Sequence, residues 1–193
     1  MIPMPPCDKS VIGQPAPMEA RLVHVVGRQN HGKTTLIAAL SEALGARGLR
    51  VGSVKHTEHV HEIDTPGKDS FRHRQAGASP VAMVTAELTA VFLPGVDPRR
   101  PYEALSPLFA SCDLVLVEGH LEGPGPKLEV WRKALGDPPL ATARQDILAV
   151  VTDDAPEGLA PPVFPRGDLE ALLSCLHDHP VFGPRLYPKT RPR

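Results

Sequence analysis

Short apolar runs and amphipathic segments alternate along this chain, and that pattern predicts an α/β fold. Residues 22–26 (LVHVV) are mostly apolar and β-branched, and residues 114–117 (LVLV) form an uninterrupted apolar run. Such runs are typical of strands in the middle of a parallel sheet, where both faces are buried. Leu36, Leu40 and Leu44 recur at helical spacing between them. We therefore expect a mostly parallel sheet flanked by helices.

The rest of the pattern places the other elements. Strands are predicted over residues 49–57, 79–87, 88–95 and 146–154, a short helix over 67–77, and longer helices over 102–112 and 168–179. Residues 121–133 alternate after a Pro/Gly-rich turn, which predicts an edge strand or a β-hairpin arm that extends the sheet. We expect one domain over residues 20–180, between a proline-rich leader at 1–19 and a Pro- and Arg-rich tail at 181–193.

A phosphate-binding loop is indicated between the first strand and the first helix. Residues 27–35 (GRQNHGKTT) have the spacing Gly-x-x-x-x-Gly-Lys-Thr of a P-loop NTPase. The two glycines permit φ angles that a Cβ would block, so backbone N–H groups and the helix N-terminus can face phosphates. Lys33 can reach the β- and γ-phosphates, and the Thr34 hydroxyl can bind Mg²⁺. The predicted nucleotide contacts are Gly27, Asn30, His31, Gly32, Lys33, Thr34 and Thr35.

Several acidic residues are candidates for binding the Mg²⁺ ion and the nucleotide base. Asp64 opens Asp-Thr-Pro-Gly, a form in which the carboxylate can lie near Mg²⁺ and the Gly67 N–H can contact a γ-phosphate. Glu118 ends an apolar strand that we expect beside the loop, where it can bind Mg²⁺ directly or through water. Asp153 follows another buried strand, and a carboxylate there can read the N1–H and amine of guanine. The chain has no Asn-Lys-x-Asp motif, so the base reader stays open.

Basic and histidine side chains gather in two places. Lys55 and His56 stand at the exit of a predicted strand, where ligand-facing residues collect in open α/β sheets. Lys68, Arg72 and Arg74 make the short helix basic and can clamp phosphates, although solvated charge explains them equally well. Lys127 and Arg132, with Glu129 between them, suggest a substrate or partner surface on the predicted edge strand. Histidines 56, 59 and 61 fit either a transition-metal site or a polar loop.

Composition narrows the class of protein. The 193-residue chain has a net charge of −1, which argues against a broad nucleic-acid-binding face. Its three cysteines are scattered, so neither a disulfide framework nor a cysteine zinc site is indicated. The N-terminal residues lack the pattern of a signal peptide, and no apolar run approaches the length of a transmembrane helix. We therefore expect a cytoplasmic protein with no nucleic-acid or membrane partner.

Five segments together resemble a known family. GRQNHGKTTL, VGSVKHT, DTPGKDSFRHRQAGA, LVLVEG and PKLEV occur in that order. This order resembles the MobB family, the molybdopterin-guanine dinucleotide biosynthesis adaptor proteins. The resemblance covers roughly residues 21–153, and DTPGKDSFRHRQAGA is far more specific than the phosphate loop alone.

The resemblance implies a P-loop GTP-binding protein, usually a homodimer, that acts late in molybdenum cofactor assembly. Its partner would be the guanylyltransferase that joins GMP to molybdopterin, and molybdopterin itself is a further candidate ligand. Thr34, Asp64 and Glu118 would surround Mg²⁺; Lys33, Asp64 and Glu118 would act in GTP hydrolysis that is slow at most. A basic surface near the phosphorylated pterin would comprise Lys68, Arg72, Arg74, Lys127 and Arg132.

Two other function classes fit part of the sequence. Val117-Glu118-Gly119 after a buried strand also resembles dethiobiotin synthetase, an ATP-dependent ligase. A kinase or ligase of that type would prefer ATP and would turn over with a small-molecule acceptor. Histidines 56, 59 and 61 instead suggest a metallochaperone GTPase like those of urease or hydrogenase maturation, which would bind Ni²⁺ or Zn²⁺ stoichiometrically.

Overall fold

The computed structural model describes residues 21–57, 62–95, 97 and 102–179. The chain divides into two compact units, one formed by residues 1–56 and 105–193 and the other by residues 57–104. The leader, the tail and His59 and His61 lie outside the described residues. The expectation of one domain over residues 20–180 stays a prediction.

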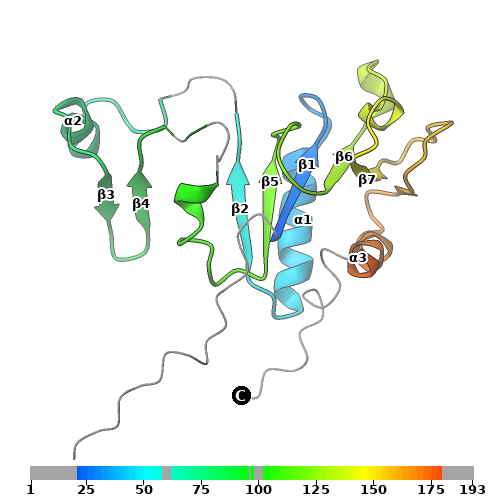
Figure 1. The fold of residues 1–193 in the computed structure, drawn as a ribbon, viewed down its shortest axis with the longest axis horizontal. Coiled ribbons are helices and arrows are strands. Elements are labelled where there is room, and N and C mark those ends of the chain that lie inside the picture. Colours follow the sequence, from blue (N-terminus) through cyan, green and yellow to red (C-terminus); the bar gives the residue numbers. More distant parts are fainter. Residues whose placement is uncertain (1–20, 58–61, 96, 98–101, 180–193) are drawn as a thin grey trace, which may run out of the picture. The chain divides into compact units, whose positions relative to one another are not determined.

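The first unit is built on a six-stranded sheet (Figure 1). Its order is β2-β5-β1-β6-β7-β8, and every neighbouring pair is parallel. The strands are β1 (Leu22–Val26), β2 (Val51–Lys55), β5 (Leu114–Glu118), β6 (Lys127–Val130), β7 (Ile147–Val151) and β8 (Val163–Phe164). All strands point the same way, so their carboxyl ends meet at one edge of the sheet. That edge carries the phosphate loop.

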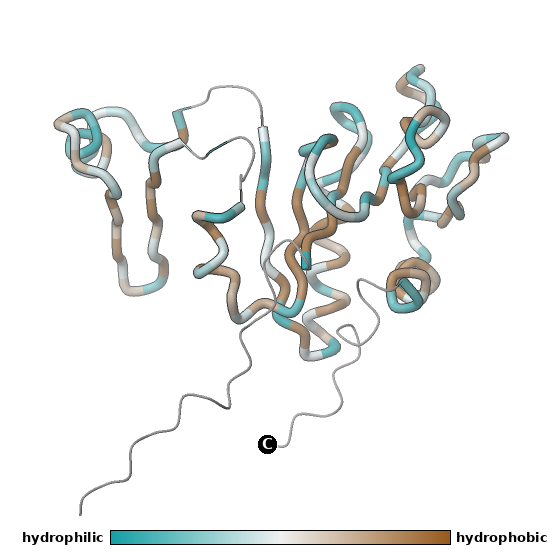
Figure 2. The backbone as a smooth tube through the Cα atoms, viewed as in Figure 1, coloured by the Kyte–Doolittle hydropathy of each residue, from teal (hydrophilic) through white to brown (hydrophobic). Residues whose placement is uncertain are grey.

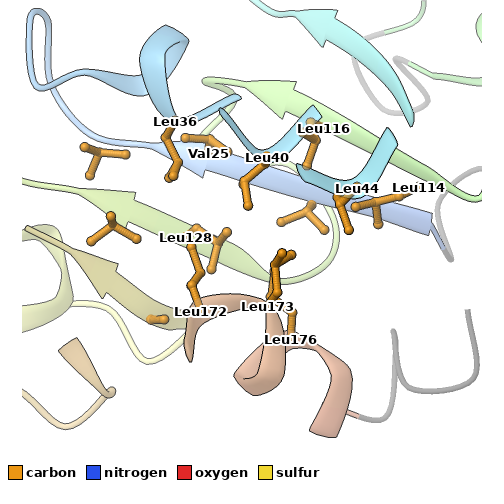
Figure 3. Close-up of a cluster of buried hydrophobic side chains, with 14 of the residues drawn as sticks. Val25, Leu36, Leu40, Leu44, Leu114, Leu116, Leu128, Leu172, Leu173 and Leu176 are labelled. Atoms are coloured by element: carbon orange, nitrogen blue, oxygen red, sulfur yellow. The ribbon is translucent and has the colours of Figure 1, made fainter. Parts of the chain in front are cut away.

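Two helices cover one face of this sheet. The first, α1 (Lys33–Ala46), buries Leu36, Leu40 and Leu44, as its periodicity predicts. The second, α3 (Leu169–Asp178), buries Leu172, Leu173 and Leu176. Figure 3 shows these leucines pointing toward Val25, Leu116 and Leu128 of the strands, in one apolar cluster. Asp168 caps the N-terminus of α3, because its carboxylate accepts a hydrogen bond from the Ala171 N–H at 3.1 Å.

The other face of β6 and β7 is covered by irregular structure. Short 3₁₀-helices, η4 (Lys133–Leu135) and η5 (Leu140–Thr142), follow β6. Val26, Trp131 and Val150 form a second apolar cluster with Ala141 and Ile147. Figure 2 shows hydrophobic residues concentrated along the central strands. Within the described residues, no helix is long and apolar enough to cross a membrane.

The second unit contains α2 (Asp69–Gln75) and a hairpin of β3 (Val81–Val84) and β4 (Thr89–Phe92). The two strands pair antiparallel in a sheet of their own. The predicted α/β class is therefore confirmed: a mostly parallel sheet flanked by helices, with a β-hairpin extension.

Two element predictions are wrong. Residues 102–112 form only η3 (Glu103–Leu105) and turns; Leu108 is 60% exposed, although Phe109 packs closely against Gly52 of β2. Residues 127–130 are not an edge strand, because β6 lies between β1 and β7 with all four residues buried. The pattern reads as an edge strand because Lys127 and Glu129 are charged, and both charges are satisfied internally.

Candidate functional site

The loop between β1 and α1 has the backbone that its glycines predict. Gly27, Asn30 and Gly32 all have positive φ angles, of 136°, 65° and 106°. A Cβ on Gly27 would lie 2.4 Å from the Val130 carbonyl oxygen, so no larger residue fits beside β6. The asparagine accepts a left-handed angle more readily than most residues do. Loop and helix N-terminus together therefore have the form of an anion-binding site.

Lys33 lies over this loop. Its ammonium donates to the carbonyl oxygens of Gly27 at 2.9 Å and Arg28 at 2.8 Å. Desolvation lowers the pKa of Lys33, and the neighbouring Glu118 opposes that effect. The amine is thus held where it can meet phosphate oxygens bound by the loop.

One flank of the loop brings together an acid, a hydroxyl and a cation. The Thr34 hydroxyl donates to the Glu118 carboxylate at 3.0 Å. The Lys55 ammonium lies 3.8 Å from the other oxygen of Glu118. Oxygens bound at adjacent positions of an octahedral Mg²⁺ ion, each about 2.1 Å from it, lie about 3 Å apart. The Thr34 and Glu118 oxygens therefore fit Mg²⁺ in type and in spacing.

The third predicted Mg²⁺ ligand, Asp64, belongs to the second unit. Its side chain is 5% exposed and accepts hydrogen bonds from the Thr65 N–H, the Ser70 hydroxyl and the Arg74 guanidinium. These bonds tie the carboxylate to the start of α2. Gly67 has a φ of 82° in the turn before that helix. The roles of Asp64 at Mg²⁺ and of Gly67 at a γ-phosphate stay predictions.

The other flank of the loop holds two arginines. Arg132 Nε and Arg166 Nη2 both donate to the His31 carbonyl oxygen, each at 3.1 Å. The His31 imidazole is 1% exposed, and its Nδ1 accepts the Arg132 N–H at 3.1 Å. Burial lowers the pKa of His31. The imidazole therefore anchors the loop to the end of β6, and the nucleotide contact of His31 stays a prediction.

Asp153 is bound to one of these arginines. Its carboxylate accepts the Arg166 N–H at 2.9 Å, and its second oxygen lies 3.7 Å from Arg166 Nε. The side chain is nevertheless 66% exposed, so it stays open to a ligand. Its part in reading guanine stays a prediction.

The chain segment that follows β6 also contacts the phosphate loop. Asp137 Oδ1 lies 3.2 Å from Arg28 Nε of the loop, and the Asp137 carbonyl oxygen accepts the Trp131 indole N–H at 2.8 Å. Asp154 accepts the Lys133 N–H at 2.7 Å. The segment that contains η4 is thus fixed to the loop and to the end of β7.

Two residues of the predicted basic surface are held by contacts within the protein. Lys127 is 3% exposed; its ammonium donates to the Gly123 and Gly125 carbonyl oxygens and pairs with Asp146 at 2.9 Å. Arg74 pairs with Glu62 at 2.6 Å and with Asp64, and its guanidinium lies over the rings of Phe71 and Phe92. Neither cation is therefore an open surface charge.

The other predicted surface cations are accessible. Lys68 and Arg72 are exposed, and Lys68 lines a cavity of about 440 Å³ in the second unit, together with Asp64, Ser70 and His73. Their role with a substrate or partner stays a prediction.

The histidine prediction is tested only at His56. The His56 ring stacks on His120 with 4.0 Å between centroids, and His120 meets buried His24 edge-on. In the part of the chain that the structure describes, no group of three or more His, Cys, Asp or Glu side chains is placed to hold a metal ion. These rings pack beside the end of β5.

Sequence reasoning missed Arg28, Asp137 and Arg166. The signal for Arg166 was the apolar pair Val163–Phe164 followed by Pro-Arg-Gly, a short strand with a charge just after its end. Arg28 and Asp137 carried no signal, because their pairing joins residues far apart in the sequence.

Comparison with known proteins places the chain among relatives. A family model described as molybdopterin guanine dinucleotide synthesis protein B matches residues 22–153. A molybdopterin-guanine dinucleotide biosynthesis adapter protein of Haemophilus influenzae is 36% identical over 133 residues, which are 68% of this chain and 74% of that protein. The Escherichia coli protein of the same name is 33% identical over 73% of this chain and 82% of its own length.

Solved structures agree with the sequence matches. The crystal structure of Bacillus subtilis MobB aligns with a TM-score of 0.62 at 30% identity, covering 82% of this chain and 99% of that one. A MobB homologue from Bacillus stearothermophilus aligns with a TM-score of 0.55 at 29% identity, covering 78% and 91%. The family match spans well over half of the sequence and includes the phosphate loop, Glu118 and Asp153. The chain therefore belongs to the MobB family, the molybdopterin guanine dinucleotide synthesis protein B family.

Proposed function

We propose that this chain is a GTP-binding adapter in the synthesis of molybdopterin guanine dinucleotide. The observation that carries the proposal is the contact of Thr34 with Glu118 beside Lys33, at the mouth of a glycine loop. A loop, a lysine and two oxygen ligands are the parts that hold a nucleoside triphosphate with its metal.

Each of these residues has a distinct part in binding. The loop N–H groups and the α1 N-terminus hold phosphate oxygens, and Lys33 exchanges its loop carbonyls for β- and γ-phosphate oxygens. Thr34 and Glu118 would hold Mg²⁺, which neutralises charge on the β- and γ-phosphates when bound. Lys55 limits the negative charge at Glu118.

Slow hydrolysis suits an adapter. Lys68 follows Gly67, where a glutamine that orients water would be expected of a fast GTPase. Nucleotide occupancy would then persist long enough to be read by a partner. The proposed partner is the guanylyltransferase that attaches GMP to molybdopterin, in the cytoplasm.

A homodimer is part of the proposal. The β3–β4 hairpin exposes apolar side chains that a second copy would cover: Met83, Val84, Leu88 and Val91. Lys68 and Arg72 remain candidate contacts for molybdopterin phosphate.

Calorimetry of GTP and ATP binding, each with Mg²⁺, tests the nucleotide assignment. We expect saturable binding with a preference for GTP. Lys33→Ala should weaken GTP binding by about 2–3 kcal/mol, since charge-assisted hydrogen bonds are lost while the fold is kept. Lys133→Ala, which removes an exposed lysine near the loop, is the matched control and should bind as the parent does.

Each contrary result has a distinct meaning. A Lys33→Ala protein that binds GTP as the parent does would contradict the assignment of the loop. A preference for ATP would favour the ligase or kinase class instead. Absence of any saturable nucleotide binding by the parent would remove both.

A further inference from the structure

The order of the strands gives the phosphate loop two chemically different flanks. The loop follows β1, whose neighbours on one side are β5 and β2 and on the other side β6, β7 and β8. Glu118 and Lys55 end β5 and β2, on the flank where we place Mg²⁺. The opposite flank has its own set of charged side chains.

That set follows a regular rule. On this flank, a charged residue lies two positions after the end of each of three strands. These residues are Arg132 after β6, Asp153 after β7 and Arg166 after β8. Parallel strands bring these positions to one edge of the sheet. The hydrogen bonds of both arginines to the His31 carbonyl oxygen, and of Asp153 to Arg166, join them directly to the loop.

The two guanidinium groups lie against the loop at Gly32. A Cβ at that residue would be 3.3 Å from Arg132 Nη2 and 3.7 Å from Arg166 Nη1. Gly32 is the last residue before α1, so the arginines stand where the loop meets the helix N-terminus. A small cavity of about 60 Å³ lies there, lined by Gly32, Thr35 and Arg166 among others.

The charges of this pair are only partly balanced among the described residues, by Asp153 beside Arg166. Among the described residues, no carboxylate forms an ion pair with Arg132, whose Nη1 and Nη2 make no hydrogen bond. Arg166 Nε is buried without a hydrogen bond, although Asp153 lies 3.7 Å away. Burial and the charge of Arg132 lower the pKa of Arg166. Two adjacent like charges with free donors fit an anion that accepts several hydrogen bonds.

We propose that Arg132 and Arg166 bind the α-phosphate of the guanine nucleotide, as a clamp on the flank of the loop away from Mg²⁺. Mg²⁺ held by Thr34 and Glu118 would neutralise charge on the terminal phosphates at that flank, which leaves the α-phosphate to the opposite flank. There the free guanidinium N–H groups meet α-phosphate oxygens. This inference rests on the proposed nucleotide function and assigns Arg132 to the nucleotide, where the sequence had suggested a pterin or partner surface.

The Arg132–Arg166 clamp should contribute a part of the nucleotide affinity that does not depend on Mg²⁺. Contacts at Thr34 and Glu118 act through Mg²⁺, whereas arginine contacts to the α-phosphate do not. The two flanks can therefore be separated by measuring GDP affinity with Mg²⁺ and with EDTA.

Calorimetry with GDP compares the parent with five variants: Arg132→Ala, Arg132→Lys, Thr34→Val, Lys33→Ala and Lys133→Ala. Arg132→Ala should weaken GDP binding at least tenfold, by the same factor with Mg²⁺ as with EDTA. Arg132→Lys should recover only part, because an ammonium lacks the planar fork. Thr34→Val should instead abolish most of the gain that Mg²⁺ gives, and Lys133→Ala should match the parent. Far-UV circular dichroism and urea unfolding check that each variant is folded.

The outcomes separate the two proposals. If Arg132→Ala binds GDP as the parent does while Lys33→Ala does not, the clamp is wrong and the nucleotide site stands. If the loss in Arg132→Ala appears only with Mg²⁺, the arginine acts on the metal flank and the clamp is likewise wrong. If the parent binds neither GTP nor GDP, the proposed function fails and the clamp fails with it.

Discussion

Buried charges on β6 fix the loops around the sheet. Lys127 holds the carbonyl oxygens of Gly123 and Gly125 and pairs with Asp146. Glu129 is 1% exposed, and its carboxylate accepts the N–H groups of Leu140 and Ala141 at 2.6 and 2.9 Å. Burial raises the pKa of Glu129, and the two backbone donors oppose that effect. These side chains supply hydrogen bonds to backbone N–H and carbonyl groups that would otherwise lack a partner.

Lys127→Ala should therefore destabilise the fold. It leaves two carbonyl oxygens without their donor and removes one of the two cations at Asp146, which keeps Arg144. This should lower the free energy of unfolding by about 3 kcal/mol. Urea unfolding measures the change, and exposed Lys133→Ala should alter stability by less than about 0.5 kcal/mol. If Lys127→Ala is as stable as the parent, Lys127 does not stabilise the fold.

His24 makes stability depend on pH. The ring is fully buried in β1, and its Nε2 lies 2.7 Å from the Pro124 carbonyl oxygen. Burial lowers the pKa of His24 to about 4 from 6.5. Between these values the unfolded chain binds a proton that the folded chain does not, so stability falls as pH decreases from about 6.5 to about 4.

The loss should reach about 3 kcal/mol at pH 4. Urea unfolding between pH 7.5 and 4 measures it, and His24→Gln should flatten this part of the profile. His177→Gln, at an exposed histidine of α3, is the control, because it removes a histidine and leaves the buried ring in place. A His24→Gln profile as steep as that of the parent would show that another group causes the acid loss.

At the scale of elements, hydrophobic periodicity predicted the strands and helices whose buried positions are nearly all apolar. The strands β1, β5 and β7 are apolar throughout or nearly so, and α1 and α3 have leucine stripes facing the sheet. Charged Lys127 and Glu129 misled the same reasoning in β6, because their partners come from loops that no local pattern reveals. Residues 102–112 have helical spacing, but the chain turns there after a single 3₁₀ turn.

The candidate site divides in the same way. The loop, Lys33 and Thr34 could be predicted because they are contiguous, and Glu118 because it ends a buried strand. The convergence of Arg132 and Arg166 on the loop could not, since their hydrogen bonds to His31 span 101 and 135 residues. The sequence likewise gives no sign that the His31 ring is buried or that Arg74 is held by Glu62.

The N-cap of α3 offers a test at this scale. Asp168→Ala removes the acceptor of the Ala171 N–H and should lower the free energy of unfolding by about 1 kcal/mol. Asp168→Asn keeps a side-chain oxygen at the cap and should cost much less. Thermal or urea unfolding compares the two variants, and equal losses would contradict a capping role.

For the whole molecule, the two units differ in how they bury apolar surface. The first unit buries apolar side chains of its parallel sheet in two clusters. The second exposes the larger part of Val84 and Leu88, each 75% exposed, on a hairpin of only two strands. A two-stranded hairpin is marginal by itself, so additional burial of this surface would stabilise it.

If the parent is the proposed homodimer, the double variant Val84→Lys/Leu88→Lys should shift it to a monomer. Like charges would be buried at the proposed contact, and their desolvation is costly. Light scattering after gel filtration measures the mass over a range of concentrations. Glu87→Lys, a charge change between the same positions, is the control; a parent of monomeric mass at all concentrations would refute the homodimer.

The single tryptophan gives the loop an optical reporter of its own. Trp131 is 6% exposed, precedes Arg132, and donates its indole N–H to Asp137, the residue that pairs with Arg28 of the phosphate loop. Its emission comes from one known environment, without interference from other indoles. A ligand that draws Arg28 or Arg132 toward itself would change the brightness or colour of that emission, and stopped-flow fluorescence could then time nucleotide arrival and departure without any attached dye.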